Sequence, residues 1–194
     1  SPRGKSSLQP AGTNHLEERS VIGYQLSAFS FRRQPTANSH PPSLLYNEPA
    51  TTEINRLSIH DAQLLAEGAR AEAEKIGVPM CIAIVDESAN LVYFERMDGG
   101  KVTSTIVAQD KAYTAAGARK ATHDYNAACV PGNLAFGIHT AIGGRLCVVG
   151  GGLPVSVDGE VVGGIGLSSG TPQQDMQCAQ AGIDHFLART GAEA

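Results

Sequence analysis

Tryptophan is absent from this 194-residue chain, and aromatic side chains make up only 5% of it. Few aromatic side chains leave little surface on which nucleic-acid bases could stack. The formal net charge of −4 gives no general attraction to a phosphate backbone. No apolar run has the length of a transmembrane helix. We therefore expect neither a nucleic acid nor a membrane among the partners of this chain.

The motifs of several site classes are also missing. The four cysteines are far apart and form no C-x-x-C pair, so free thiols in a reducing, cytoplasmic compartment are expected before disulfides or zinc. No H-x-x-x-H or H-E-x-x-H spacing supports a metal site, and none is predicted. No G-x-S-x-G motif marks a nucleophilic serine.

The first fifty residues differ in composition from the rest. They carry five Lys or Arg against three Asp or Glu, a net charge of +2, whereas residues 51–194 carry ten against sixteen, a net charge of −6. They are rich in proline, serine and asparagine and show no helical or strand periodicity. No continuous apolar stretch follows their basic residues, as a secretory signal would require. We expect a polar arm or leader at 1–56 and a globular domain at 57–194, and an organellar leader is left open.

Start and stop signals predict the elements of this domain. Ser58 and Asp61 form a capping-box pattern before a helix that Gly77 ends. Residues 80–86 and 91–95 are β-rich runs on either side of a turn, which predicts a hairpin. A helix is expected from Thr103 or Ser104 to about residue 118, and short helical turns and loops over 121–145.

The last part of the chain predicts a second hairpin and a helix. Two apolar runs, 146–157 and 161–167, flank Asp158-Gly159, a dipeptide typical of tight hairpin turns. Thr171, Pro172 and Gln174 suit the N-cap, first and third positions of a helix that runs to about residue 187.

Residues 163–171 combine three strand glycines with a helix N-terminus. Such a loop can point several backbone N–H groups at one spot and hold an anion, although every helix start needs a cap of this kind. We predict that the segment forms the floor of a small-ligand site and that Ser169→Gly alters ligand affinity without unfolding the domain. The predicted ligand-binding residues are Arg96, Lys111, Thr114, Gly166, Ser168, Ser169, Gly170 and Thr171.

Lys111 lies on a helix of otherwise small and apolar residues. It is either a surface residue with its ammonium in water, the more common case, or a charge aimed into a pocket. In the second case Arg96 and Lys111 would hold an anion, and Asp98 or Asp175 would act as a base. The alternative for Arg96 and Asp98 is an exposed ion pair of little energetic value.

Taken in order, the motifs resemble one family over about residues 57–190. They include Ala83-Ile84-Val85-Asp86, Arg96-Met97-Asp98-Gly99, Lys111-Ala112-Tyr113-Thr114-Ala115, Gly163-Gly164-Ile165-Gly166 and Ser168-Ser169-Gly170-Thr171. Together they resemble the GlcG, HbpS and PduO C-terminal family, described as haem-binding or haem-degrading. Where the family usually has Ser-Gly-Gly-Thr, this chain has Ser169 in place of the first glycine, which adds a hydroxyl to the loop.

The resemblance implies a profilin-like fold of the α/β (α+β) class, with a central antiparallel sheet of hairpins flanked by helices. It also implies a homo-oligomer built from dimers, up to an octamer, and binding of haem or another small ligand in some members. It does not imply one shared reaction.

Three functions remain open from the sequence. The first is a ligand-binding accessory protein for haem or a related tetrapyrrole; the second is an enzyme acting on a small organic acid or aldehyde; the third is a purely structural oligomer subunit. Haem iron requires an axial ligand. The domain offers His123, His139, His185, Cys129, Cys147, Met97 and Tyr113, and the sequence does not choose among them.

Overall fold

The computed structural model describes residues 53–193, so most of the predicted arm at 1–56 lies outside the described residues. The elements are α1 (Ile59–Lys75), β1 (Cys81–Asp86), β2 (Leu91–Arg96), α2 (Ser104–Gly117), α3 (Thr122–Ala128), the 3₁₀ turns η1 (Ile138–Thr140) and η2 (Ile142–Gly144), β3 (Gly152–Val157), β4 (Glu160–Ser168) and α4 (Pro172–Thr190). The short turns and loops predicted over 121–145 are therefore confirmed.

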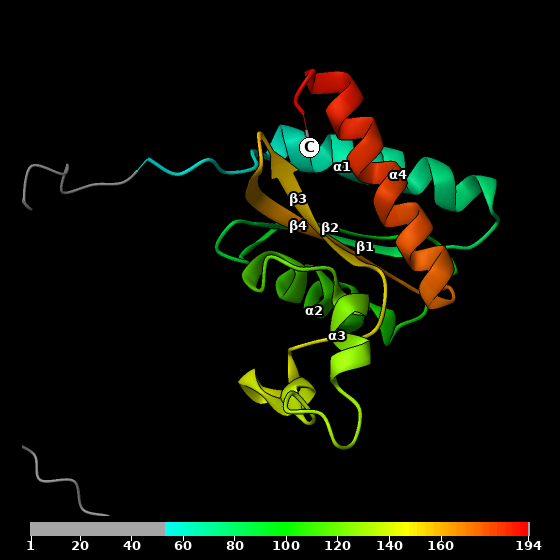
Figure 1. Ribbon diagram of the computed structural model, residues 1–194. Helices are drawn as coiled ribbons and strands as arrows, with labels where there is room; N and C mark the ends of the chain where they lie inside the picture. Colours follow the sequence, from blue (N-terminus) through cyan, green and yellow to red (C-terminus); the bar gives the residue numbers. More distant parts are fainter. Residues whose placement is uncertain (1–52, 194) are drawn as a thin grey trace, which may run out of the picture. The chain divides into compact units, whose positions relative to one another are not determined.

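The four strands form one antiparallel sheet in the order β2-β1-β4-β3. Helices α1 and α4 cover one face and α2 covers the other, with α3 beside α2 (Figure 1). The central strand β1 is buried along its whole length because helices lie on both of its faces. This arrangement confirms the predicted antiparallel sheet of hairpins flanked by helices.

The second hairpin is shorter than predicted. Its turn is as expected, because Asp158 and Gly159 both have positive φ, as a type I′ turn requires. However, β3 begins at Gly152 and not at residue 146. Gly151 has a φ of +117°, which interrupts an extended strand. The apolar run 146–149 therefore lies outside the sheet.

The helix ends follow the predicted chemistry. The Ser58 hydroxyl accepts from the Asp61 amide, and the Asp61 carboxylate accepts from the Ser58 amide, which completes a capping box at α1. Thr171 and Gln174 complete a second one at α4. Helix α4 continues beyond the predicted residue 187 to Thr190, because Gly191 is the first residue after it with left-handed φ.

Glycines in β4 allow α2 to lie against the sheet at close range. A Cβ on Gly164 would come 2.7 Å from the Ala112 carbonyl oxygen, and a Cβ on Gly166 would overlap the Ala108 carbonyl oxygen. Glycine in a strand interior commonly marks such an approach of another backbone. The chain's own helix therefore covers these glycines on this face.

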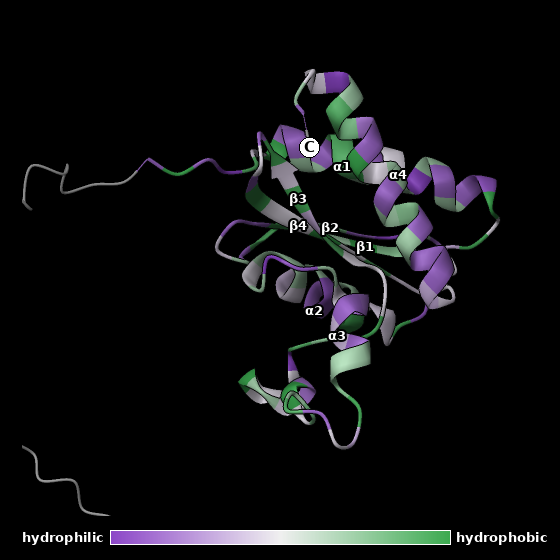
Figure 2. Ribbon diagram, viewed as in Figure 1, coloured by the Kyte–Doolittle hydropathy of each residue, from purple (hydrophilic) through white to green (hydrophobic). Residues whose placement is uncertain are grey.

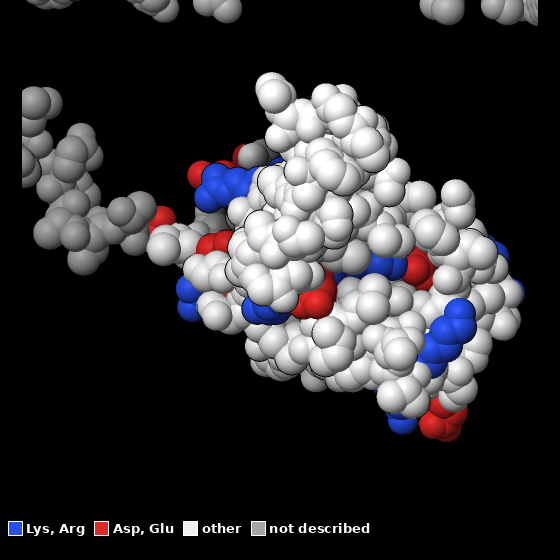
Figure 3. Space-filling view, turned by 90° about the horizontal axis from the view of Figure 1, so that it is seen from below, with Lys and Arg blue, Asp and Glu red and all other residues white. Residues whose placement is uncertain are grey.

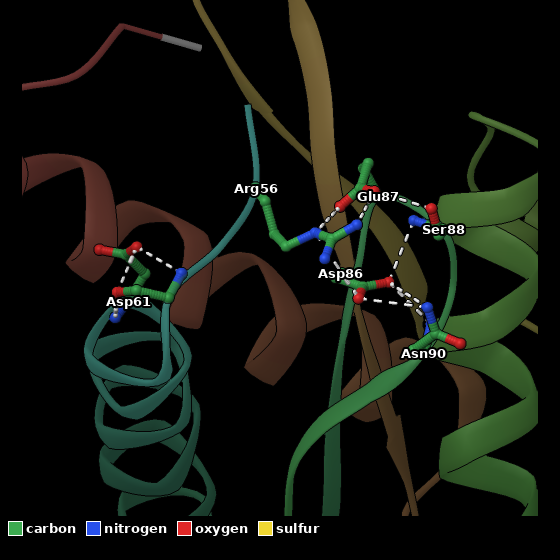
Figure 4. Close-up of polar contacts among 7 residues, drawn as sticks. Arg56, Asp61, Asp86, Glu87, Ser88 and Asn90 are labelled. Carbon is green, nitrogen blue, oxygen red and sulfur yellow. Dashed lines mark hydrogen bonds and ion pairs between the residues drawn. The ribbon is translucent and has the colours of Figure 1, made fainter. Parts of the chain in front are cut away.

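An ion pair fastens the segment before α1 to the turn between β1 and β2. The Arg56 guanidinium donates to both carboxylate oxygens of Glu87, at 2.7 and 2.6 Å (Figure 4). This contact lowers the pKa of Glu87 to about 2. Next to Arg56, the buried Leu57 side chain covers Gly163 and joins the core between the sheet, α1 and α4.

Candidate functional site

Lys111 is buried, contrary to the expectation of a surface lysine. Its side chain is 1% exposed, and its ammonium donates to Asp175 Oδ2 at 2.7 Å and to the Leu167 carbonyl oxygen at 2.8 Å. The other carboxylate oxygen of Asp175 accepts from the Gly170 amide at 3.0 Å. The two charges therefore neutralise one another inside the domain and fix the loop that precedes α4.

Gly151 covers this ion pair. An added Cβ would lie 2.6 Å from Asp175 Cβ and 2.9 Å from Lys111 Nζ, and the residue has a φ of +117°. The Gly151 carbonyl oxygen also accepts from the Leu167 amide at 2.8 Å. A side chain at this position would have to displace the pair, so glycine is required here for space as well as for conformation.

The polar groups of the loop before α4 have partners within the chain. The Ser168 hydroxyl donates to the Ser104 hydroxyl at 3.1 Å. The Ser169 hydroxyl accepts from the Lys101 amide at 2.9 Å, although Ser169 has a φ of +135°. With Gly170 bound to Asp175 and Thr171 used as the helix cap, the loop's groups stabilise its own conformation.

The structure brings only some of the predicted site residues together. Lys111 and Asp175 meet below the 168–171 loop, whereas Arg96 and Asp98 are exposed at the end of β2. Within residues 53–193, no ion pair joins Arg96 to Asp98. Of the predicted ligand-binding and catalytic residues, only Thr114 lines one of the two cavities described below. That these residues bind a ligand stays a prediction.

Two neighbouring cavities lie on the outer side of α2, against the segment 138–149. The larger, called here the α2 cavity, has a volume of 300 Å³ and is lined by Val107, Asp110, His139, Gly144, Leu146, Cys147, Val148 and Val149. The smaller, called here the Tyr113 cavity, has a volume of 160 Å³ and is lined by Tyr113, Thr114, Gly117, Ala118, Ile142 and Leu146. Leu146 forms part of both walls.

Thr114 holds the wall segment against α2. Its hydroxyl oxygen accepts from the Cys147 amide at 2.8 Å and lies 2.7 Å from the Asp110 carbonyl oxygen and 3.2 Å from that of Arg145. The side chain is buried, so these bonds are shielded from water. Thr114, predicted as a ligand-binding residue, thus lines the Tyr113 cavity and holds the segment that forms the wall of the α2 cavity.

The sequence analysis named only Cys147 in the stretch 144–149 as a candidate site residue. Residues 146–149 had the apolar pattern of a strand and were assigned to the second hairpin. A usable signal was present in Gly150-Gly151-Gly152, because consecutive glycines inside a strand pattern suggest an interruption. The chain turns away from the sheet there and lies along α2.

His139 and Cys147 line the α2 cavity, and Cys129 contacts His139 without lining the cavity itself. The Cys129 sulfur and His139 Nδ1 are 3.0 Å apart, which leaves Nε2 as the ring nitrogen without a recorded partner within residues 53–193. Burial raises the pKa of the Cys147 thiol, which disfavours its thiolate form. His139 is therefore the stronger candidate for a metal-bound cofactor.

Exposed apolar side chains are common in the segments that form the α2 cavity. Large exposed hydrophobic side chains gather on α2 and on the segment that follows α3: Val102, Ile106, Val107, Val130, Leu134, Phe136, Ile142 and Val149. Figure 2 shows hydrophobic stretches in this part of the ribbon, and in Figure 3 charged side chains of both signs are scattered over a mostly uncharged face. Exposed apolar patches of this kind mark ligand or protein contacts.

Other site classes find less support in the described part of the chain. The cysteines are free thiols. Within residues 53–193, no group of three or more His, Cys, Asp and Glu side chains is placed to hold a metal ion. No helix in that range is both long and apolar enough to cross a membrane.

Comparison with known proteins gives a consistent match. A family model described as "Haem degrading protein HbpS-like" matches residues 57–184. A 15.0 kDa protein from the dhaT-dhaS intergenic region of Citrobacter freundii is 36% identical over 134 residues, which cover 69% of this chain and 94% of that protein.

Two crystal structures share the fold. The Klebsiella pneumoniae protein ORFY superimposes with a TM-score of 0.70 at 31% identity, covering 72% of this chain and 96% of that one. A structure entitled as a PduOC:heme complex gives a TM-score of 0.65 at 33% identity, covering 67% of this chain and 94% of that one.

Proposed function

This chain belongs to the HbpS-like family of haem-degrading proteins, and we propose that it binds haem or a closely related tetrapyrrole in the α2 cavity. The observation that carries the proposal is that this cavity combines mostly apolar walls with one histidine and one carboxylate, Asp110. A structural relative described as a complex with haem adds support.

The residues of the cavity fit a tetrapyrrole. A porphyrin ring is flat and largely apolar, and Val107, Leu146 and Val149 would bury part of it. The neighbouring Tyr113 cavity extends the apolar surface beyond Leu146. The exposed hydrophobic residues nearby would shield the rest of the ring from water.

His139 is the residue that we propose as the axial ligand. Its contact with Cys129 holds the ring through Nδ1, as a second group commonly orients a metal-binding histidine, and leaves Nε2 for iron. Bound haem would supply the iron chemistry. The chain's own residues would orient the ring, limit its contact with water and set the ligand at the iron.

The other predicted ligands are less suited. His185 lies on α4, across the sheet from α2, and His123 is exposed beside Asp124. The Met97 sulfur accepts a hydrogen bond from the Met80 amide at 3.3 Å. Tyr113 lies under the Arg145 guanidinium.

The test is a titration of the full chain with haemin, followed by the Soret absorbance. We expect saturable binding by the unchanged protein. His139→Ala should weaken binding by at least about tenfold and shift the Soret maximum, because an axial bond is lost. Imidazole added to the His139→Ala protein should restore much of the spectrum.

Two other exposed histidines provide matched controls. His60→Ala, on α1, and His123→Ala, on α3, should leave the titration unchanged. Loss of the Soret band with either control, or an unchanged titration with His139→Ala, would show that the α2 cavity is not the haem site. Absence of any spectral change for the unchanged protein at micromolar haemin would overturn the function itself.

The alternative of an enzyme that holds a small anion through Arg96 and Lys111 gains no support from the geometry. The Lys111 charge is buried and neutralised by Asp175, while Arg96 is exposed on β2. The third hypothesis, a purely structural subunit, expects no pocket, whereas two adjoining cavities are present.

A further inference from the structure

Arg145 lines neither cavity itself, but its side chain contacts one lining residue of each, Asp110 of the α2 cavity and Tyr113 of the Tyr113 cavity. It directly follows η2, and its neighbour Leu146 lines both the α2 cavity and the Tyr113 cavity. The Thr114 hydroxyl bonds the Cys147 amide and lies near the Arg145 carbonyl oxygen, so the backbone here is fastened to α2. The side chain therefore starts from a fixed position beside the proposed tetrapyrrole site.

The contacts of the Arg145 side chain orient its guanidinium group. The group lies over the Tyr113 ring, 3.9 Å from the ring centroid, and Nε donates to Asp110 Oδ1 at 3.1 Å. Within residues 53–193, neither terminal nitrogen has a recorded partner. Both can donate to a planar carboxylate in the paired geometry that arginine favours.

The polarity of the cavity walls beside Arg145 favours a ligand that is apolar in its body and acidic at its edge. Apart from Asp110 and His139, the walls of the α2 cavity are apolar or small. An apolar ligand with a carboxylate at its edge could bury its body against Leu146 and Val149 while the carboxylate binds the arginine. The side chain is 48% exposed, so the ligand's carboxylate can remain partly hydrated.

We infer that Arg145 binds a carboxylate of the ligand, so that the site selects apolar ligands with an acidic edge. This inference rests on the proposed function, in which that carboxylate is a propionate of the tetrapyrrole. The Tyr113 ring stacks against one face of the guanidinium group and orients its plane. Asp110 holds Nε and also competes with the ligand for the same positive charge.

The experiment compares haemin with haemin dimethyl ester, whose propionates are uncharged. The unchanged protein should bind haemin about tenfold more tightly than the ester, as expected for one charge-assisted contact. Arg145→Ala should lose this preference by weakening haemin binding while leaving ester binding nearly unchanged. Asp110→Asn should widen the preference, because it removes the competing carboxylate.

Arg189→Ala is the matched control, because Arg189 is exposed near the end of α4 on the opposite face of the sheet. It should keep the preference of the unchanged protein. Equal binding of haemin and ester by the unchanged protein, or a full preference in Arg145→Ala, would overturn the inference while leaving the haem proposal standing. Binding of neither compound would instead overturn the haem proposal. Arg145→Lys, which keeps the charge without the planar fork, should retain only part of the preference.

Discussion

Three residues of the predicted site, Lys111, Asp175 and Ser169, stabilise the fold. Lys111 and Asp175 form a buried pair 2.7 Å apart that connects α2 to the start of α4. Ser169 adopts a backbone conformation that favours glycine, with a φ of +135°, and its hydroxyl binds the Lys101 amide. In both cases the side chain holds together segments that are distant in the sequence.

Removal of Lys111 alone should be strongly destabilising. Lys111→Met leaves the Asp175 carboxylate buried without a cation, which should lower the free energy of unfolding by about 3–5 kcal/mol. Adding Asp175→Asn removes the uncompensated charge and keeps an acceptor for the Gly170 amide. The double variant should therefore be more stable than Lys111→Met by at least about 1 kcal/mol in urea unfolding. Equal stability of the two variants would contradict this explanation.

Ser169 should tolerate glycine better than alanine. Both substitutions lose the bond to the Lys101 amide, but only glycine relieves the strained backbone. We expect Ser169→Gly to be more stable than Ser169→Ala by about 1–2 kcal/mol, measured by urea unfolding. An alanine variant as stable as the glycine variant would mean that the backbone is unstrained. The effect of Ser169→Gly on ligand affinity stays a prediction.

At the scale of elements, the close contact between α2 and β4 positions the cavities. Gly164 and Gly166 let the helix backbone approach the strand, and Thr114 on that helix then holds the segment 145–147 on its outer side. Strand glycines and cavity walls are thus joined through one helix. A substitution in β4 that displaces α2 should therefore also alter the shape of the cavities.

Gly166→Ala tests this contact. A Cβ there would overlap the Ala108 carbonyl oxygen and the Ala112 amide nitrogen, both backbone atoms that cannot move independently. We expect a loss of about 3 kcal/mol in the free energy of unfolding and weaker haemin binding. Gly117→Ala is the control for stability alone, because its Cβ would meet only Ala89 at 3.9 Å although Gly117 lines the Tyr113 cavity. It should stabilise the end of α2 by about 0.5–1 kcal/mol. A Gly166→Ala protein of unchanged stability would show that α2 shifts freely.

At the scale of the whole molecule, the exposed hydrophobic residues are concentrated in one stretch of the chain. Of eleven such residues among 53–193, eight fall between Val102 and Val149. The resemblance to a family of assembling proteins predicts a homo-oligomer, and this stretch offers an apolar surface for a second copy. The expected contribution of the arm concerns residues that lie mostly outside the described part of the chain.

We expect the full chain to have a mass in light scattering above the 20.2 kDa of one subunit. Leu134→Ser together with Phe136→Ser should lower that mass, because both side chains are exposed on this stretch. Ile59→Ser, an exposed change on α1, is the control and should leave the mass unchanged.

Deletion of residues 1–50 should lower the mass or the melting temperature if the arm adds contacts. A full-length chain that is monomeric at micromolar concentration would refute the prediction.

The sequence by itself determined the local features of this protein. Capping boxes at Ser58 and Thr171 and the turn at Asp158-Gly159 depend on neighbouring residues, so their chemistry can be recognised without a fold. The antiparallel sheet followed from the two hairpins and the family resemblance.

Only the tertiary structure decided which side chains meet. Lys111 has the pattern of a surface residue, yet its partners are 56 and 64 positions away in the chain. Val107 and Val149 line one cavity because Gly151 interrupts the strand pattern and the segment 146–149 lies along α2. Burial, ion pairing and cavity shape depend on contacts between segments that are distant in the sequence. The hydrophobic periodicity of one segment cannot predict such contacts.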